Sequence, residues 1–374
     1  MTQLPTVAPY YAVKCNPAAP LLRHLYEAGI GFDCASEREL LEVKKMSPDA
    51  PIVYANPCKS ERDIRVAKEL GAPVTVIDSV EELEKLEAYA GGSLIRIAVD
   101  DSASAMPFSS KFGASVESIQ RIGGAAAAYG VTLKGVSFHV GSGSADPDAH
   151  SKAIAKAIYC NKLLAKQGHK HANIIDIGGG YLADTGQFVE TAEAIRAAQT
   201  PEYKWIAEPG RFLATSAFDF YVQVIGKKRH GPGWKYTIDD SLYGQFSCIL
   251  FDYATPNWMR ISEPGDVRGR APGVMFGRTC DSVDVIARAE MMEELVVGDW
   301  LWFPGMGAYT RATASEFNGF PTPEVFVDHT TELTSFNEFT NQLNFEDYAI
   351  KMATNVTRMP PVSAKAFWSS GCQS

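Results

Sequence analysis

The sequence predicts an α/β fold, a (β/α)8 barrel of the TIM type, followed by a mainly antiparallel β domain. Two observations predict it. Up to Ala207, short apolar or β-branched segments alternate with helical stretches, which is typical of parallel strands joined by helices. After about Phe218 the helical periodicity fades, and β-rich segments separated by turn residues take over, as expected of an antiparallel sheet.

The first part of the chain contains the strand candidates of the barrel. They are residues 10–15, 31–35, 52–55, 74–78, 94–98, 135–139, 174–177 and 204–207. Helix-start signals follow several of them, because Ser36 and Ser79 each precede a Glu three residues later, and Asp146 precedes a proline. Strand–helix alternation repeated eight times is what closes a barrel, and a doubly wound open sheet is the alternative.

The second part contains shorter, β-rich segments. We expect strands at residues 218–225, 235–238, 274–276, 283–287, 299–303 and 325–327. From about His329 the chain becomes polar and less patterned. The predicted organisation is therefore a barrel at 1–217, a β domain at 218–328 and a divergent tail at 329–374.

Composition narrows the class of protein. Of the 374 residues, 46% are hydrophobic and 21% are charged, which excludes a disordered or coiled-coil chain. A formal net charge of −9 without a clustered Lys/Arg run argues against a nucleic-acid partner. No apolar run approaches the ~20 residues of a membrane span, and the N-terminus does not resemble a signal peptide. We expect a cytoplasmic protein without a membrane partner.

The seven cysteines are scattered, at positions 15, 34, 58, 160, 248, 280 and 372, and none forms a C-x-x-C pair. Neither a disulfide framework nor a zinc site follows from this spacing, so we expect no metal. A reducing compartment fits such a set. It leaves open that one of the thiols is chemically active.

Polar residues stand at the ends of the predicted barrel strands, where barrel enzymes place their active sites. They are Lys14, Asp33, Arg96, His139, the glycines 178–180, Glu208, Gly210 and Arg211. Three consecutive glycines let backbone N–H groups approach a phosphate, and the last two loops of a barrel are its usual phosphate site. Together with a lysine, they indicate a phosphorylated cofactor bound through a Schiff base. Taken singly, a strand-end lysine, a core histidine and a tight glycine turn are ordinary structural features.

Five segments of the barrel resemble motifs of the eukaryotic-type ornithine decarboxylases, which have the alanine-racemase fold and use pyridoxal phosphate. The segments are residues 11–16 (YAVKCN), 32–36 (FDCAS), 137–143 (SFHVGSG), 176–180 (DIGGG) and 207–211 (AEPGR). The resemblance continues at residues 243–246, 280–284, 298–300, 307–310 and 317–320. The chain starts almost at the first barrel strand, and its stretch from Asp176 to Glu208 is shorter than usual in the family.

The resemblance implies a role for each residue around pyridoxal phosphate. Lys14 would bond to the cofactor aldehyde, His139 would stack on the pyridine ring, and Glu208 would pair with the ring nitrogen. The phosphate would be held by Ser142, Gly178, Gly179, Gly180, Gly210, Arg211 and Tyr309. Asp33 and Arg96 match further positions around the cofactor.

The resemblance also implies how a substrate is bound and processed. Cys280 would return a proton to Cα after loss of CO2, and Asp281, Asp252 and Tyr243 would bind the substrate. Cys280 and Asp281 would come from the neighbouring subunit of a homodimer with shared active sites. Two carboxylates facing one distal ammonium favour a cationic diamino acid, and the short Asp252 favours ornithine over arginine.

Three alternatives stay open. One methylene separates lysine from ornithine, so a lysine decarboxylase is one, and an enzyme for a modified ornithine in specialised metabolism is another. The third is a non-catalytic homologue like the antizyme inhibitors, which have lost cofactor and substrate residues. This chain retains such residues, which argues for catalysis: Lys14, Asp33, Arg96, Asp176, Cys280 and Asp281. An antizyme-like regulator is a further partner that the family suggests.

Overall fold

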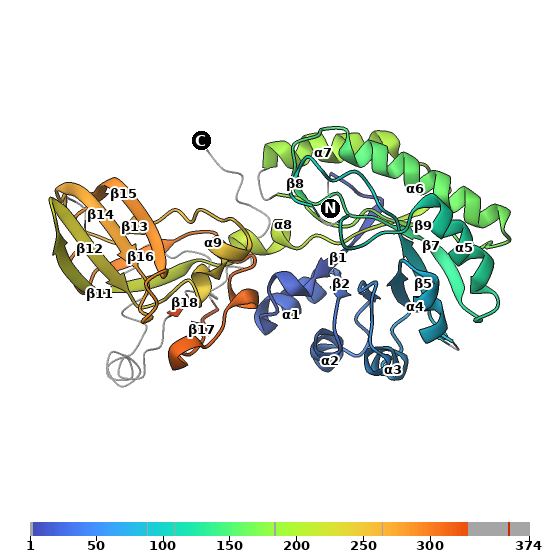
Figure 1. Cartoon of the computed structure of the whole chain (residues 1–374), viewed down its shortest axis with the longest axis horizontal. Helices are drawn as coiled ribbons and strands as arrows, with labels where there is room; N and C mark the ends of the chain where they lie inside the picture. The colour runs from blue at the N-terminus through green and yellow to red at the C-terminus, as the bar shows by residue number, and fades with distance from the viewer. Residues whose placement is uncertain are drawn as a thin grey trace. The chain divides into compact units, whose positions relative to one another are not determined.

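The computed structural model describes residues 3–87, 89–107, 109–182, 185–263, 265–327 and 358–359. The chain divides into two compact units, Met1–Leu213 and Ala214–Ser374. The first unit contains the barrel and the second contains the β sheet (Figure 1).

The first unit is a closed barrel of parallel strands, which confirms the predicted fold class. The strands follow one another around the barrel in the order β1-β10-β9-β7-β5-β4-β3-β2. Their bounds are β1 Val7–Ala12, β2 Gly31–Cys34, β3 Ile52–Tyr54, β4 Val74–Ile77, β5 Gly92–Arg96, β7 Thr132–Ser137, β9 Ile174–Asp176 and β10 Lys204–Ala207. Closure is made by β1, which pairs with β2 on one side and with β10 on the other.

The first barrel strand differs from its prediction. It ends at Ala12, and Lys14 lies in a short 3-10 helix, η1 (Val13–Cys15), instead of at the end of a strand. One hydrogen bond spans this turn, because the hydroxyl of Tyr11 before it donates to the carbonyl of Asn16 after it, at 3.1 Å. Alternation of apolar residues cannot separate a strand from a single 3-10 turn that continues it.

Helices connect the barrel strands and lie outside them (Figure 1). Their bounds are α1 Ala19–Glu27, α2 Glu37–Met46, α3 Glu61–Glu69, α4 Val80–Lys85, α5 Val116–Ala126, α6 Ala149–Lys166, α7 Thr185–Ala198 and α8 Arg211–Ala214. Two further strands, β6 (Ser104–Met106) and β8 (Ser142–Ser144), form a short antiparallel pair. In the sequence each of them stands between two barrel strands.

Serine caps start four of these helices. The hydroxyl oxygens of Ser36, Ser60, Ser79 and Ser115 each accept from the backbone N–H three residues on, which satisfies a donor that the helix leaves unpaired. The predicted caps at Ser36 and Ser79 are therefore present. The prediction for Asp146 and Pro147 was wrong by two residues, because α6 begins at Ala149, and Asp146 instead accepts from the N–H of Asp148 at 2.9 Å.

A buried cluster from six strands fills the barrel. Val53, Val76 and Leu94 form its centre, and Tyr10, Ala55, Val74, Ile174 and Ile206 pack against them. At roughly 25 cal/mol per Å² of apolar area removed from water, such burial is the main force that holds the barrel closed. This packing keeps the strand ends, and so the side chains that follow them, in fixed positions.

Lys59 is buried in the loop between β3 and α3. Its ammonium group is inaccessible to solvent and donates to the carbonyls of Asn56 at 2.8 Å and of Val76 at 2.7 Å. The same ammonium group also lies 3.4 Å from a carboxylate oxygen of Glu82, whose backbone N–H donates to the capping hydroxyl of Ser79. Burial lowers the pKa of Lys59 to about 8. The lysine thus joins the ends of two neighbouring strands to the start of α4.

Replacing Lys59 with Met is expected to destabilise the protein by about 1–3 kcal/mol, because it leaves the buried carbonyls of Asn56 and Val76 without this donor. The Glu82 carboxylate keeps Lys85 and the backbone N–H of residue 59 as donors. Urea unfolding followed by circular dichroism measures this loss. Lys68→Met is the matched control, since Lys68 is exposed and donates to the Glu87 carbonyl. A Lys59→Met variant as stable as this control would contradict the structural role.

The second unit contains a mainly antiparallel sheet in the order β13-β16-β11-β12-β14-β15. The bounds are β11 Phe220–His230, β12 Gly233–Ile238, β13 Met259–Arg260, β14 Arg270–Phe276, β15 Val285–Glu293 and β16 Trp300–Phe303. One pair, β12 with β14, is parallel. The sequence prediction missed β13, a two-residue strand too short to show alternation.

Short helices and a small second pairing complete this unit. They are η2 Thr215–Ala217, η3 Gln245–Ser247, α9 Cys248–Phe251, η4 Arg311–Thr313, η5 Phe317–Gly319 and the parallel pair β17 Glu324–Val325 with β18 Arg358–Met359. Apart from residues 358–359, the predicted tail at 329–374 lies outside the described residues.

Candidate active site

The predicted site residues fall into two groups, one in each compact unit. Those of the barrel follow or end its strands: Lys14 after β1, Asp33 in β2, Arg96 in β5, His139 after β7, the glycines 178–180 after β9 and Glu208 after β10. The carboxyl ends of parallel barrel strands open on one face, so these residues share that face.

Lys14 and Asp33 form an ion pair. The Lys14 ammonium donates to Asp33 Oδ2 at 3.1 Å; the Asp33 side chain is 1% exposed and that of Lys14 is 46% exposed. Val13 and Cys15, on either side of Lys14, are fully buried and fix the turn. A lysine with only a structural role at a strand end extends its ammonium group into solvent. Lys14 instead faces a buried carboxylate, so it is not an ordinary solvent-facing lysine.

His139 is held by the backbone that follows it. Its Nδ1 accepts from the N–H of Gly141 at 3.0 Å, which leaves the ring proton on Nε2 in the neutral form. Burial lowers the pKa of His139 well below its usual value, and the charges of Arg96 and Lys14 lower it further. The imidazole is therefore neutral near pH 7.

The glycine turn after β9 needs glycine for steric reasons. Gly178 has φ +64° and Gly180 has φ +95°, and a β-carbon at either position would collide with a backbone oxygen, of Phe138 or of Gly141. The N–H groups of Gly179 and Gly180 donate to no acceptor in the part of the chain that the structure describes. Free backbone N–H groups in such a turn are suited to an anion.

Asp176 and Glu208 form a buried carboxyl pair. Asp176 Oδ1 accepts from the N–H of Gly178 at 2.8 Å, and the two side chains hydrogen-bond to each other. Burial raises the pKa of Asp176 to about 7 and raises that of Glu208 well above its usual value, so the pair retains a proton near neutral pH. Within the described residues, no donor reaches Glu208 Oε1. The sequence analysis counted Asp176, which opens the DIGGG motif, among the retained residues but did not predict that it pairs with Glu208.

The remaining barrel residues of the prediction lie around this centre. The Arg96 guanidinium carbon lies 5.2 Å from the centroid of the Phe112 ring. Ser142 begins β8, and Arg211 begins α8 directly after the buried Gly210. All three side chains are half-buried.

In the second unit the structure brings Tyr243 and Asp281 together. The Tyr243 hydroxyl donates to Asp281 Oδ2 at 2.5 Å, and this bond lowers the pKa of Asp281. Phe317 stacks on the Tyr243 ring with centroids 4.1 Å apart, a neighbour that the sequence analysis did not place in the site. Cys280 is exposed, and its backbone N–H donates to Asn318 Oδ1 at 3.1 Å.

Asp284 anchors the loop that carries Cys280 and Asp281. Its carboxylate is 1% exposed and accepts from the N–H groups of Leu242 at 2.8 Å and of Thr279 at 3.1 Å. The anchor explains why the loop leaves the sheet in a defined conformation. Without it, the polar backbone of the turn would have no partner for these two donors.

Asp252 and Tyr309 lie in two other loops of the second unit. Asp252 follows α9, where its N–H donates to the Cys248 carbonyl at 3.0 Å. Tyr309 lies after β16 with φ +55°, a left-handed conformation that costs energy for a residue with a side chain. Thr313 Oγ1 donates to its carbonyl at 2.8 Å. Such strain persists where surrounding contacts fix a residue, and it often marks functional loops.

Among the described residues, no group of three or more His, Cys, Asp or Glu side chains is arranged to hold a metal ion. In this described part there is also no helix of the length and apolarity that crossing a membrane requires.

Comparison with known proteins identifies the family. The model of the pyridoxal-dependent decarboxylases, pyridoxal binding domain, matches residues 1–215. The chain belongs to the pyridoxal-dependent decarboxylases. The chloroplastic ornithine decarboxylase of Nicotiana glauca is 40% identical over 340 residues, which cover 86% of this chain and 78% of that protein. Antizyme inhibitor 2 of Xenopus laevis is 38% identical, over 85% of this chain and 75% of that one.

Solved structures of other decarboxylases are also similar. The Paramecium bursaria Chlorella virus arginine decarboxylase bound to agmatine has a TM-score of 0.81 at 34% identity, covering 85% of this chain and 88% of that one. The lysine/ornithine decarboxylase of Vibrio vulnificus, complexed with cadaverine, has a TM-score of 0.79 at 32% identity, covering 88% and 90%.

The cofactor of the decarboxylase is pyridoxal phosphate, and the barrel site fits it. The lysine amine of η1 suits its aldehyde, and the free N–H groups of Gly179 and Gly180 suit its phosphate. Among the described residues, Glu208 Oε1 accepts from no donor, which suits a protonated ring nitrogen. These three features meet on the face of the barrel that the strand ends define.

Proposed function

We propose that this decarboxylase converts L-ornithine to putrescine and CO2, the first step of polyamine synthesis from that amino acid. The observation that carries the proposal is the convergence of Lys14, His139 and Glu208 at one end of the barrel, in a chain 40% identical to an ornithine decarboxylase. When bound, pyridoxal phosphate supplies an electron sink for the electron pair that remains on Cα as the carboxyl group leaves.

In the proposed mechanism the barrel residues bind and orient. Lys14 would hold the cofactor aldehyde, and the neighbouring Asp33 pairs with the lysine ammonium. The neutral His139 would bind the ring, and Arg96 would contribute to holding the cofactor. The phosphate would be held by Ser142, the glycines 178–180, Gly210 and Arg211, and the family resemblance adds Tyr309.

Glu208 would hold the proton on the ring nitrogen. Its buried carboxyl is paired with Asp176 and has one acceptor atom without a donor, so a cationic N–H supplies the partner that this atom lacks. A charge-assisted bond of this kind is about twice as strong as a neutral one. The ring stays cationic, which is the form that accepts electrons.

Replacing Glu208 with Gln is expected to lower kcat by about a hundredfold, because the amide keeps the shape but cannot stabilise the ring proton. Release of CO2 from ornithine measures this. The matched control is Glu202→Gln, an exposed glutamate in the loop before β10, which should leave kcat unchanged. A tenfold change in rate corresponds to ~1.4 kcal/mol of activation free energy. A Glu208→Gln enzyme whose kcat lies within twofold of that of the control would therefore exclude the proposed role.

The second group of residues would select the substrate and complete the reaction. Asp281, fixed by Tyr243, and Asp252 would face the distal ammonium of a diamino acid, and Cys280 would return the proton to Cα. What supports this is the Tyr243–Asp281 hydrogen bond and the similarity to enzymes for ornithine, lysine and arginine. We propose that Cys280 and Asp281 act in the neighbouring subunit of a homodimer, whereas Asp252 acts in the subunit that holds the cofactor.

Ornithine, lysine and a modified ornithine differ only at the distal end. Lysine is one methylene longer, which changes binding by only ~1–3 kcal/mol, so a lysine decarboxylase is the closest alternative activity. An antizyme-inhibitor-like role without catalysis is the other alternative, since such a protein is 38% identical. The retained Lys14–Asp33 pair and the exposed Cys280 favour catalysis. An antizyme-like regulator and a cytoplasmic location stay predictions.

The test is CO2 release by the purified holoenzyme from ornithine, lysine, arginine and diaminopimelate. Ornithine should give the highest kcat/KM, with lysine the closest competitor. Asp252→Glu should lower kcat/KM for ornithine, because it shortens the space for the distal ammonium. If lysine is preferred, the substrate assignment is wrong. If no amino acid is decarboxylated although the cofactor is bound, the enzyme assignment is wrong.

A further inference from the structure

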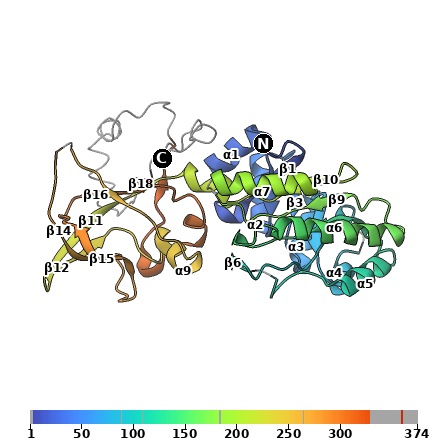
Figure 2. The same ribbon diagram turned by 90° about the horizontal axis from the view of Figure 1, so that it is seen from above.

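A cavity of about 370 Å³ lies in the barrel unit between the start of α6 and α7, beside the glycine turn that is assigned to the cofactor phosphate. We call it the α6–α7 pocket; it is lined by residues 140, 143–148, 150, 180–182, 187, 188, 190, 191 and 194. The two helices lie side by side (Figure 2). Its volume falls within the ~300–1,000 Å³ typical of small-molecule sites.

Two buried side chains with polar atoms, His150 and Tyr181, line the inner part of the α6–α7 pocket. His150 is 9% exposed and Tyr181 is 6% exposed, and their rings stack with centroids 5.5 Å apart. In the described part of the chain, neither His150 Nε2 nor the Tyr181 hydroxyl has a hydrogen-bond partner. Burial lowers the pKa of His150 to about 4, so its imidazole is neutral near pH 7 and can donate or accept. A buried polar group without a hydrogen-bond partner lowers the stability of the fold, which indicates that a ligand supplies the missing partner.

The outer wall is acidic. Asp146, Asp148 and Glu190 line the α6–α7 pocket, and no lysine or arginine is among the described residues that line it. The Lys152 ammonium compensates the Asp146 carboxylate at 2.8 Å, which leaves the carboxylates of Asp148 and Glu190. The N-terminus of α6 contributes only about half a positive charge, so two carboxylates outweigh it. The balance favours a cation over an anion.

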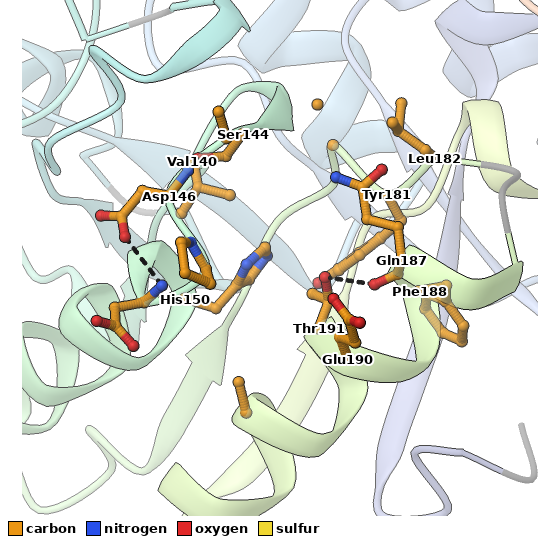
Figure 3. Close-up of a pocket in the computed structure, with 16 residues that line it drawn as sticks. Val140, Ser144, Asp146, His150, Tyr181, Leu182, Gln187, Phe188, Glu190 and Thr191 are labelled. Atoms are coloured by element: carbon orange, nitrogen blue, oxygen red, sulfur yellow. Dashed lines mark hydrogen bonds between the residues drawn. The ribbon is translucent and has the colours of Figure 1, made fainter.

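The lining also contains carbon surface. It comes from Val140, Leu182 and Phe188, which are labelled in Figure 3, and from Pro147. A short hydrocarbon chain fits beside these side chains, with a charged end toward the carboxylates. Hydrated inorganic cations would leave the carbon surface without a partner, so the ligand class is an organic cation.

We propose that the α6–α7 pocket binds a small alkylammonium ion, at a site separate from that of the substrate. The ammonium group is held by Asp148 and Glu190, and the carbon chain lies against Leu182 and Phe188. The unpaired His150–Tyr181 stack forms the inner end of the site.

The α6–α7 pocket shares a wall with the cofactor site, so we expect its ligand to change how the cofactor is held. Gly180 lines the pocket and also belongs to the glycine turn assigned to the phosphate. Tyr181 is close enough to Asp176 and Glu208 that both carboxyls, after burial, raise its pKa. This consequence rests on the proposed cofactor placement, whereas binding itself does not.

Calorimetric titration of the holoenzyme with N,N-dimethylbutylamine tests the site. This tertiary amine is cationic at neutral pH and cannot form a carbon–nitrogen double bond with the cofactor aldehyde. One amine should bind per chain, and 1-butanol and butyrate should not bind. The site would be refuted by an absence of saturable amine binding, or by equal binding of butyrate.

Variants locate the binding. Glu190→Gln should weaken amine binding by about tenfold, because it removes a charge-assisted partner. Glu193→Gln is the matched control on the same helix, since Glu193 lies 3.7 Å from Arg196 and does not line the α6–α7 pocket. His150→Phe, which keeps the ring stack, should also weaken binding. Equal binding by Glu190→Gln and Glu193→Gln would exclude this pocket as the amine site.

A second readout tests the link to the cofactor. The dissociation constant of pyridoxal phosphate, measured by its visible absorption, should change at least about twofold with saturating amine, since coupled sites typically differ by such factors or more. The change should be absent in Glu190→Gln. An unchanged constant in the original chain would refute the coupling. Amine binding without ornithine decarboxylation would instead refute the proposed function and leave the site standing.

Discussion

Replacing Lys14 with Ala is expected to abolish the visible absorption of lysine-bound pyridoxal phosphate and to lower ornithine decarboxylation by about a thousandfold or more. Lys14 is the amine that the structure holds against a buried carboxylate in the 3-10 turn after the first strand, 3.1 Å from Asp33. Alanine provides no amine for the aldehyde. Absorption spectra and CO2 release on the same preparations measure both effects.

The control for this variant is Lys14→Arg. Alanine leaves Asp33, which is 1% exposed, without its ammonium partner, and loss of a buried partner can itself unfold a protein. Arginine retains the positive charge for Asp33 but cannot form the bond to the aldehyde. We therefore expect Lys14→Arg to be folded and equally inactive. Unchanged absorption in Lys14→Ala would mean that another residue holds the cofactor.

The barrel could be predicted from the sequence because its strands are buried on both sides and its helices begin with local capping signals. Residues 31–34 and 52–54 are entirely buried, so their apolar runs mark strands directly. Ser36 and Ser79 mark helix starts through contacts only three residues long. Features of this kind are encoded within a few residues, and a single sequence reveals them.

The features that were missed depend on residues distant in the sequence. Asp176 belongs to the site through its pairing with Glu208, which lies at the end of the next strand. The His150–Tyr181 stack joins α6 to the turn after β9, and only the fold shows that their polar atoms lack partners. Alternation and capping patterns carry no information about such contacts. The short β13 and the turn at Lys14 were missed for a different reason, because each is shorter than one period of the pattern.

Cys280→Ala is expected to retain the cofactor and to lose most putrescine formation, because no thiol returns the proton to Cα. If sites are shared, Cys280 acts in the neighbouring subunit, and its exposure in its own chain suits that arrangement. Mixing this variant with Lys14→Ala then restores activity. In each mixed dimer one site carries both substitutions and the other carries none.

In a two-fold symmetric dimer, random exchange of subunits makes half of the dimers mixed. Half of the sites in these mixed dimers are intact. The mixture should therefore reach about a quarter of the original activity. Mixing Lys14→Ala with Lys14→Arg is the control, and it should restore nothing because every site lacks the lysine. A site built within one chain would give no recovery in either mixture once exchange is demonstrated by mass spectrometry. Recovery to a quarter in the first mixture alone requires that Lys14 and Cys280 act together from different subunits.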